Sequence, residues 1–265
     1  MPSNPPIVLL SGFKAGTWMM RKILTEMTGL HYYEPPIIPG ERKYYNADQL
    51  VFADGHYYSW HLIPTPEVIE RLRSVNAKTI FIARNIYDVV LSIYYHFYNN
   101  IDEDIGRGAG KADFLKQFTF EEGLSLIITG FDEQGIRWNG MKEVLEHYNA
   151  MCEASAQCDS ILLSYDRIVN DKQSVVEELS SFLEISLETK TLEAILSQSS
   201  FETMKTQAEL SGIGSSHFRE GKASHNRKKL LYSHKIQLRS MLKAHAPHLG
   251  TNALAAGIAD IMNEH

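Results

Sequence analysis

Short apolar runs that end in polar or glycine-containing turns recur along the chain. Ile7 to Leu10 ends at Ser11-Gly12, and Leu50 to Ala53, Thr79 to Ala83 and Ser160 to Ser164 have the same character. Runs of this length, bounded by turn residues, are typical of buried strands. The β-branched content of Thr79 to Ala83 favours a central position in a sheet.

Between these runs, apolar residues recur at helical spacing. From Tyr87 to Tyr98 they occupy the positions that one face of a helix would bury. The glycine-rich stretch Asp102 to Ala112 is expected to be a mobile loop. Further helices are expected over Thr17–Met27, Pro66–Arg73, Met141–Ala154, Lys172–Phe182, Glu188–Gln198 and Leu230–Lys243.

Strands that alternate with helices predict an α/β fold in which helices cover both faces of a central parallel sheet. The 265 residues, without repeats or a linker, suit a single domain over residues 1–265. A hydrophobic share of 44% is enough for a substantial core.

The net charge of −6 argues against a nucleic-acid binder, which normally carries a basic excess. No apolar run has the length of a membrane span, and the first residues lack the pattern of a signal peptide. Cys152 and Cys158 have neither zinc-site nor redox-pair spacing, so reduced thiols are expected. We therefore expect a cytoplasmic protein without a metal site. No pattern specifies an oligomeric state.

The segment SGFKAGTW, from Ser11 to Trp18, joins the first predicted strand to the first predicted helix. A loop at this place aims backbone N–H groups and a helix dipole at one point, where an anion can bind. Lys14 adds a positive charge and Thr17 a hydroxyl. The lysine precedes Gly16, so the nucleotide-triphosphate motif GxxxxGK[ST] is not met. Alternatively, the lysine is simply solvated beside a helix N-terminus.

Arg84 follows the predicted central strand, at the edge where open α/β sheets bind ligands. Ser92 lies about two helical turns later, and an arginine with a serine hydroxyl can hold one phosphate. An ion pair between Arg84 and Asp88 is the structural alternative. Positive charge also gathers from His217 to Lys229, which by itself suits a solvated basic surface.

These segments resemble the sulfotransferases that use 3′-phosphoadenosine 5′-phosphosulfate (PAPS), and they follow the family's order along the chain. The matching elements are the Lys14 loop, RNxxDVxxS from Arg84 to Ser92, Tyr165-Asp166, SSFETM from Ser199 to Met204, and FRxG from Phe218 to Gly221. The resemblance implies a P-loop-like fold and transfer of a sulfuryl group from PAPS, without a metal, leaving 3′-phosphoadenosine 5′-phosphate (PAP).

The resemblance also implies roles for individual residues. Lys14, Ala15, Gly16 and Thr17 would cradle the 5′-phosphosulfate, with Trp18 nearby. The 3′-phosphate would be bound by Arg84, Ser92 and Arg219, with the Gly221 backbone beside them. The adenine site would be lined by Tyr165, Ser199 and Phe201.

The family's catalytic histidine is best matched by His61, with His56 as the competing position. His61 would take the acceptor proton and Lys14 would stabilise the leaving phosphate. Because the base must be neutral, activity is expected to fall below about pH 6. The acceptor pocket is expected to contain Phe13, His56, Tyr57, Tyr58, Trp60 and Tyr94, covered by the Asp102 to Ala112 loop.

The acceptor is expected to be a small molecule, such as a natural product, with a hydroxyl or nitrogen nucleophile. Two other classes remain open. Leu50 to Asp54 resembles a strand that ends in a magnesium-binding aspartate, which would suit a nucleotide or small-molecule kinase. A non-catalytic module that binds a phosphorylated nucleotide is the second alternative.

Overall fold

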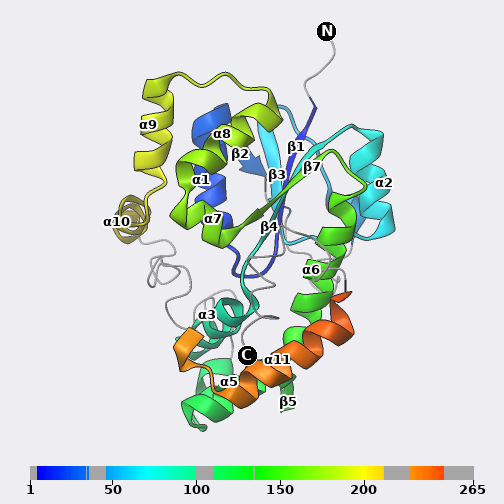
Figure 1. The fold of residues 1–265 in the computed structure, drawn as a ribbon, viewed down its shortest axis with the longest axis vertical. Helices are drawn as coiled ribbons and strands as arrows, with labels where there is room; N and C mark the ends of the chain where they lie inside the picture. Colours follow the sequence, from blue (N-terminus) through cyan, green and yellow to red (C-terminus); the bar gives the residue numbers. More distant parts are fainter. Residues whose placement is uncertain are drawn as a thin grey trace.

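The computed structural model describes residues 5–33, 35, 46–99, 110–133, 135–211 and 227–247. Its centre is a five-stranded, all-parallel sheet with strand order β2-β3-β1-β4-β7 (Figure 1). The strands are β1 (Ile7–Ser11), β2 (His31–Tyr33), β3 (His56–Trp60), β4 (Lys78–Ala83) and β7 (Ser160–Ser164).

The register of the sheet brings several sequence-distant loops to one edge. Leu10 of β1 lies opposite Trp60 of β3 and Phe81 of β4, while Ala83 lies opposite Ser164 of β7. Because the strands are parallel, their carboxyl ends meet at one edge, the usual ligand-binding edge of such sheets.

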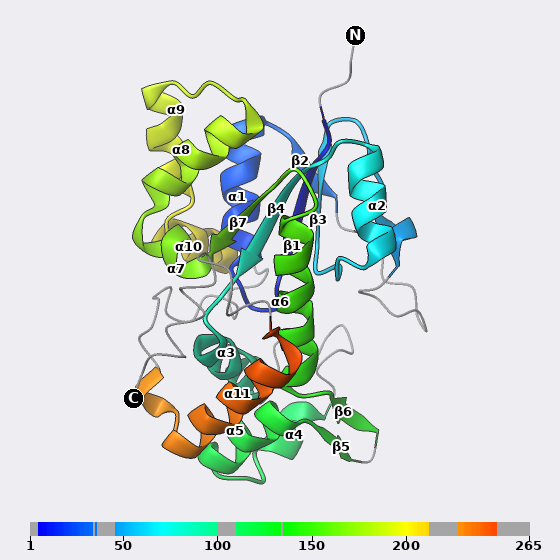
Figure 2. The ribbon, with the colours of Figure 1, turned by 45° about the vertical axis from the view of Figure 1, so that its right-hand side comes forward.

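Helices cover both faces of the sheet and extend beyond its carboxyl edge. Figures 1 and 2 show α1, α7, α8, α9 and α10 on one side, α2 and α6 on the other, and α3, α5 and α11 beyond the strand ends. The helices are α1 (Thr17–Thr28), η1 (Ala47–Gln49), α2 (Pro66–Ser74), α3 (Ile86–Tyr98), α4 (Lys111–Leu115), α5 (Phe120–Thr129), α6 (Met141–Ser155), α7 (Tyr165–Asn170), α8 (Lys172–Leu183), α9 (Thr189–Gln198), α10 (Phe201–Ser211), η4 (Arg227–Lys229) and α11 (Tyr232–His245).

Local sequence explains why several helices begin where they do. The Thr65 side chain accepts a hydrogen bond from the Val68 amide at the start of α2, where Pro66 follows directly. The Asn85 side chain caps α3 in the same way. Thr119 and Glu122 form a reciprocal capping box on α5.

The predicted α/β class, the parallel sheet and the flanking helices are confirmed. The predicted strand over Leu50 to Ala53 is wrong, since these residues follow η1 without strand pairing and the strand of this region is β3. Leu50 is buried in the core, but Val51 is exposed. This run of apolar residues is therefore not a strand that is buried on both faces. The antiparallel hairpin of β5 (Phe131–Glu133) and β6 (Ile136–Trp138), and also β2, α4, α5 and α10, were not predicted.

Two separate hydrophobic clusters hold the layers together. One gathers residues of α2, α3, α5, α6 and α11 against one face of the sheet, and includes Tyr58 and Trp60. The other joins α1, α7, α8, α9 and α10 to the opposite face, and includes Tyr57. Alternating residues of β3 therefore belong to different cores, as the two-residue period of a strand requires.

Two of the predicted features fall partly or wholly outside the described residues. The expected loop over Asp102 to Ala112 is described only from residue 110 onwards, and helix α4 begins at Lys111. Arg219 and Gly221 belong to residues 212–226, outside the described part. Among the residues that the structure describes, no helix is both long enough and apolar enough to cross a membrane.

Helix α6 starts from a contact between two glycines that leaves no room for side chains. Gly140, its N-cap, has φ 76° and ψ −172°. A Cβ there would lie 2.7 Å from the Thr129 carbonyl carbon and 2.8 Å from the Gly130 nitrogen. Backbone of this conformation is essentially restricted to glycine, so the junction of α5 and α6 depends on both residues.

We expect Gly140→Ala to lower the free energy of unfolding by about 2 kcal/mol or more, because it combines backbone strain with overpacking. Gly135→Ala is the matched control. Gly135 also has a positive φ, 85°, but a Cβ there would meet nothing within 4 Å. The control should therefore lose only about 1 kcal/mol. Urea titrations of both variants measure the difference; equal losses would show that the close contact at Gly140 is unimportant.

Candidate active site

The loop between β1 and α1 is shaped to receive an anion. Lys14 and Gly16 both have left-handed backbone conformations, with φ 58° and 94°. Gly16 is the N-cap of α1, provides no side-chain cap, and the first turn contains no acidic residue. The first amide groups of α1 therefore face the loop without a side-chain acceptor from the cap, as in phosphate-binding loops.

Tyr148 of α6 packs against this loop and holds it in place. A Cβ on Gly12 would lie 2.0 Å from Cε1 of the Tyr148 ring, so the ring occupies space that any other residue at position 12 would need. The Tyr148 hydroxyl lies 3.3 Å from the Arg84 amide and 3.4 Å from the Phe13 carbonyl oxygen. It accepts from the amide and donates to the carbonyl, and so joins the loops after β1 and β4.

Arg84, directly after β4, is packed against the same loop. Its guanidinium donates to the Lys14 carbonyl oxygen at 3.0 Å and lies 4.1 Å from the ring centroid of Tyr165. The Tyr165 ring in turn packs on Gly16, where a Cβ would come within 2.6 Å of it. The Arg84 Nε is buried without a partner among the described residues, which leaves donor capacity for an anionic ligand.

The imidazole of His61 lies beside the loop, one residue after β3. Its Nδ1 is 2.8 Å from the Ser11 carbonyl oxygen, which can only accept. Nδ1 therefore carries the proton of the neutral ring, and Nε2 keeps a lone pair, as a general base requires. The Ser11 hydroxyl lies 3.2 Å from Nδ1 and 2.7 Å from Thr17 Oγ1, so Ser11 connects His61 to the start of α1.

A second histidine lies behind His61. Phe13 stacks on His61 at 5.3 Å between ring centroids and meets His147 of α6 edge-on at 5.7 Å. His147 is fully buried, and its ring nitrogens make no well-formed hydrogen bond in the described part of the chain, although the Leu62 backbone lies near enough to favour the protonated ring weakly. Burial, followed by the charge of His61, lowers the pKa of His147 to about 3. His147 therefore stays neutral and cannot share a proton with His61 at ordinary pH.

Lys14 reaches α3. Its Nζ lies 3.4 Å from Nδ1 of His96. Ser92, which the sequence assigned to a phosphate, is four residues before His96 and so occupies the same helical face. The loop, Arg84 and this face of α3 thus converge, while the binding of a phosphate by Lys14, Arg84 and Ser92 stays a prediction.

Three other residues predicted to bind the nucleotide are Trp18, Ser199 and Phe201, and each lies in its own environment. Trp18 is 41% exposed in the first turn of α1, with the Arg21 guanidinium 5.8 Å from its ring. Ser199 is fully buried and its hydroxyl donates to the Ile195 carbonyl at 2.6 Å, so that hydroxyl is used within its own helix end. Phe201 begins α10 and is half-buried.

Five of the residues predicted for the acceptor pocket lie elsewhere or are used in the core. His56 is exposed at the amino end of β3, opposite His31, and therefore at the far edge from the loop. Tyr57 belongs to the α1 side, where its hydroxyl donates to the Arg21 carbonyl; burial raises its pKa to about 12. Tyr58 and Tyr94 are buried in the opposite core, as is Trp60. Of the predicted pocket residues, Phe13 and Trp60 have rings that pack next to His61.

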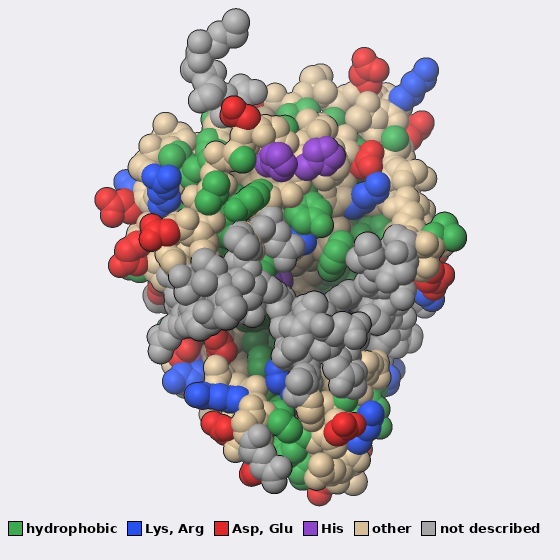
Figure 3. Space-filling view, turned by 180° about the vertical axis from the view of Figure 1, so that it is seen from behind, with side chains coloured by type: hydrophobic (Ala, Val, Ile, Leu, Met, Phe, Trp, Pro, Cys, Tyr) green, Lys and Arg blue, Asp and Glu red, His purple; other side chains and the backbone are tan. Residues whose placement is uncertain are grey.

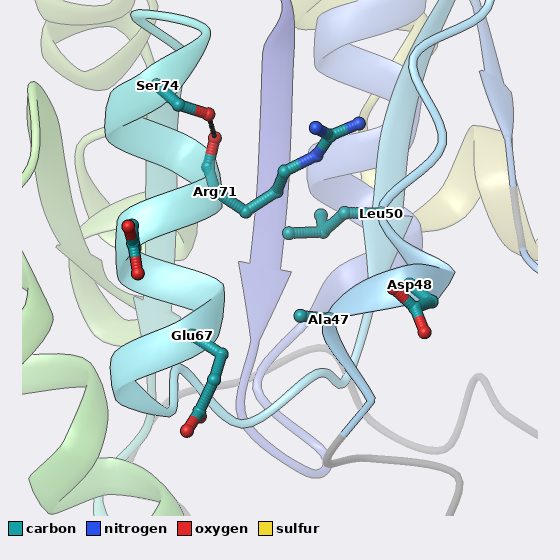
Figure 4. A pocket seen from close by; sticks show the side chains of 7 residues that line it. Ala47, Asp48, Leu50, Glu67, Arg71 and Ser74 are labelled. Atoms are coloured by element: carbon teal, nitrogen blue, oxygen red, sulfur yellow. Dashed lines mark hydrogen bonds between the residues drawn. The ribbon is translucent and has the colours of Figure 1, made fainter.

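The surface is hollowed near the middle of the face seen in Figure 3, where Lys or Arg and histidine side chains are visible inside. A different pocket, of about 450 Å³, lies between η1 and α2 (Figure 4). Asp48, Glu67 and Glu70 line it together with Arg71, so it is unsuited to phosphate.

In the part of the chain that is described, no group of three or more metal-binding side chains could hold a metal ion.

A family model described as a sulfotransferase domain matches residues 57–245. The chain belongs to the sulfotransferase domain family. Curated relatives include sulfotransferase 1C2 of Oryctolagus cuniculus, 27% identical over 49% of this chain and 38% of that protein. The 3-beta-hydroxysteroid sulfotransferase of Cavia porcellus is 29% identical over 57% of this chain and 46% of that protein. The matched segments thus span less than half of these relatives.

Solved sulfotransferase-family structures share the fold. Mouse sulfotransferase SULT7A1, complexed with PAP, superposes with a TM-score of 0.71 at 15% identity, covering 97% of this chain and 89% of that one. Retinol dehydratase, in complex with androsterone and PAP, gives a TM-score of 0.60 at 15% identity over 91% and 80% of the two chains. The structural match covers 97% of this chain and therefore extends beyond residues 57–245 of the family match.

Three residues of this candidate site were not found from the sequence. Ser11 could have been noticed as a polar residue at the end of a buried strand, directly before Gly12. Tyr148 and His147 carry no local signal, because their positions depend on how α6 packs against loops far away in the sequence. Phe13 and Arg84, which Tyr148 contacts, are 135 and 64 residues from it.

The buried His147 predicts a specific loss of stability in acid. Between pH 6.5 and about 3 the unfolded chain binds a proton at this residue that the folded chain does not bind. Stability therefore falls as the pH drops below 6.5. From pH 7 to 5.5 we expect wild type to lose about 1 kcal/mol more than His147→Leu. The same substitution at exposed His31 is the control, and urea unfolding at both pH values is the measurement. Identical losses in wild type and His147→Leu would contradict the prediction.

Proposed function

We propose that this chain transfers a sulfuryl group from PAPS to a hydroxyl group of a small apolar acceptor. The observation that carries the proposal is the position of His61, whose Nδ1 proton is directed at the Ser11 carbonyl, beside a loop that brings together Lys14 and the first amides of α1, which have no side-chain cap. Family membership supports it, and so do the similar solved structures, which contain PAP.

The donor would bind along the carboxyl edge of the sheet. The amides of Gly16, Thr17 and Trp18 and the Lys14 ammonium suit the 5′-phosphosulfate. Arg84, whose Nε is buried without a described partner, suits a second anionic group such as the 3′-phosphate. Tyr165 keeps the guanidinium in place by stacking on it.

The chain's own groups would then handle the proton and the charge. His61 accepts the acceptor's hydroxyl proton at Nε2 as the new oxygen–sulfur bond forms. The bond between sulfur and the leaving phosphate oxygen breaks, and Lys14 with the α1 amides stabilises the negative charge left on that oxygen. Ser11 keeps the imidazole in the productive tautomer through its carbonyl oxygen.

The acceptor would lie against Phe13 and Trp60, the aromatic residues nearest His61. Aromatic walls favour an apolar or ring-containing body with its hydroxyl directed at the base. The similar retinol dehydratase structures were solved with retinol and with androsterone, which are molecules of this kind. A tailoring role on a natural product, in the cytoplasm, fits this acceptor class.

The alternative kinase function has less support. Its candidate magnesium ligand, Asp54, is exposed and precedes β3, so it lies at the amino edge of the sheet, away from Lys14. If transfer stopped in EDTA and returned with magnesium, the kinase function would replace the one proposed. A purely binding function would be supported by PAP binding without turnover on any acceptor.

PAP should bind at least about tenfold more tightly than AMP, because one additional charge-assisted contact is sufficient for that factor. Calorimetry with the two nucleotides measures it. Arg84→Gln should remove most of the difference between the nucleotides. Arg71→Gln, in the acidic pocket on α2, should leave it unchanged. Equal affinities of the wild type for PAP and AMP would refute the donor assignment.

His61→Ala should reduce turnover by about 10²- to 10⁴-fold, the usual contribution of a general base. Its affinity for PAP should change little, because His61 is assigned to the acceptor side. His56→Ala is the matched control, since that histidine lies exposed at the opposite edge of the sheet. If His56→Ala were inactive and His61→Ala active, the base would have to be reassigned.

A further inference from the structure

Lys14 is contacted at two points by one continuous strand–helix unit. Its backbone carbonyl accepts from Arg84, the first residue after β4, at 3.0 Å. Its ammonium lies 3.4 Å from Nδ1 of His96, near the other end of α3. Only Asn85, buried and acting as the cap of α3, separates Arg84 from that helix. The distance between the two contacts is therefore set by a rigid helix.

The hydrogen bond between the Lys14 ammonium and the His96 imidazole has only one possible donor. A lysine ammonium has no lone pair, so Lys14 donates and His96 Nδ1 accepts. The neutral ring must then carry its proton on Nε2. A flexible lysine side chain loses much rotational freedom when it is held in one place. A fixed acceptor orders the side chain before any ligand binds, so that part of this entropy cost no longer falls on ligand binding.

We propose that His96 is a positioning residue for catalysis, which holds the Lys14 ammonium where negative charge develops on the leaving phosphate. The inference rests on the proposed function, in which Lys14 stabilises that charge. His96 itself need not touch the donor or the acceptor. Its position four residues after Ser92 places it on the helical face toward the loop.

Two substitutions separate positioning from packing. His96→Leu keeps a side chain of similar bulk but has no acceptor, whereas His96→Asn keeps an acceptor oxygen at the place of Nδ1. We expect His96→Leu to lower turnover by about tenfold and His96→Asn by less than about threefold. The affinity for PAP and the thermal midpoint should be similar in both variants, because the cradle amides and Arg84 are unchanged.

A double-mutant cycle with Lys14→Met tests whether His96 acts through Lys14. In the Lys14→Met background, His96→Leu should cause no further loss of turnover. An additional tenfold loss there would overturn the proposal, and so would full activity of the single variant His96→Leu. If instead Lys14→Met kept wild-type turnover, the proposed role of Lys14 itself would fail.

A measurement on the protein without nucleotide tests the contact independently of activity. Nitrogen-15 NMR of the histidine rings should show His96 as the Nε2-protonated tautomer in the wild type. Lys14→Met should shift the His96 nitrogen resonances, while those of exposed His31 stay in place. An Nδ1-protonated His96 in the wild type would overturn the proposal even if turnover followed the expected pattern.

Discussion

The site depends on the absence of a side chain at Gly12. The ring of Tyr148 lies where a Cβ would be, and its hydroxyl joins the backbone that follows β1 to the backbone that follows β4. Helix α6 is thereby fastened to both loops at once. Because α6 also carries His147, which contacts Phe13 as His61 does, the same helix packs against both the β1–α1 loop and the surroundings of His61.

The parallel sheet distributes the chemistry over separate strands. The loop after β1 provides Lys14, His61 follows β3, Arg84 follows β4 and Tyr165 follows β7. None of these residues lies in the interior of a strand, so each can be replaced without interrupting the ladder of hydrogen bonds. Ser11 contacts His61, and Tyr165 packs on Gly16. These contacts link the residues that follow the different strands.

Local patterns were enough to predict the elements that begin with clear signals. The strand at Ile7, the helix at Thr17 and the loop lysine between them could be predicted from the sequence. An apolar run ends before Gly12, and a stretch of helix-forming residues begins after Gly16. The strand β3 was missed because its aromatic residues face both cores and leave no simple alternation. His56 and Tyr57 were assigned to the pocket by their nearness in sequence to His61, but a strand carries neighbouring residues to opposite faces and ends.

Among the described residues, the two hydrophobic clusters are separate and lie on opposite faces of the sheet, with Tyr57 in one and Tyr58 in the other. Phe13 and Trp60 belong to the cluster on the α6 side. Substitutions that reshape one core are therefore insulated from the other by a layer of hydrogen-bonded backbone. Under the proposed function, a chain built in this way can change the acceptor that it modifies while the side assigned to PAPS remains unaltered.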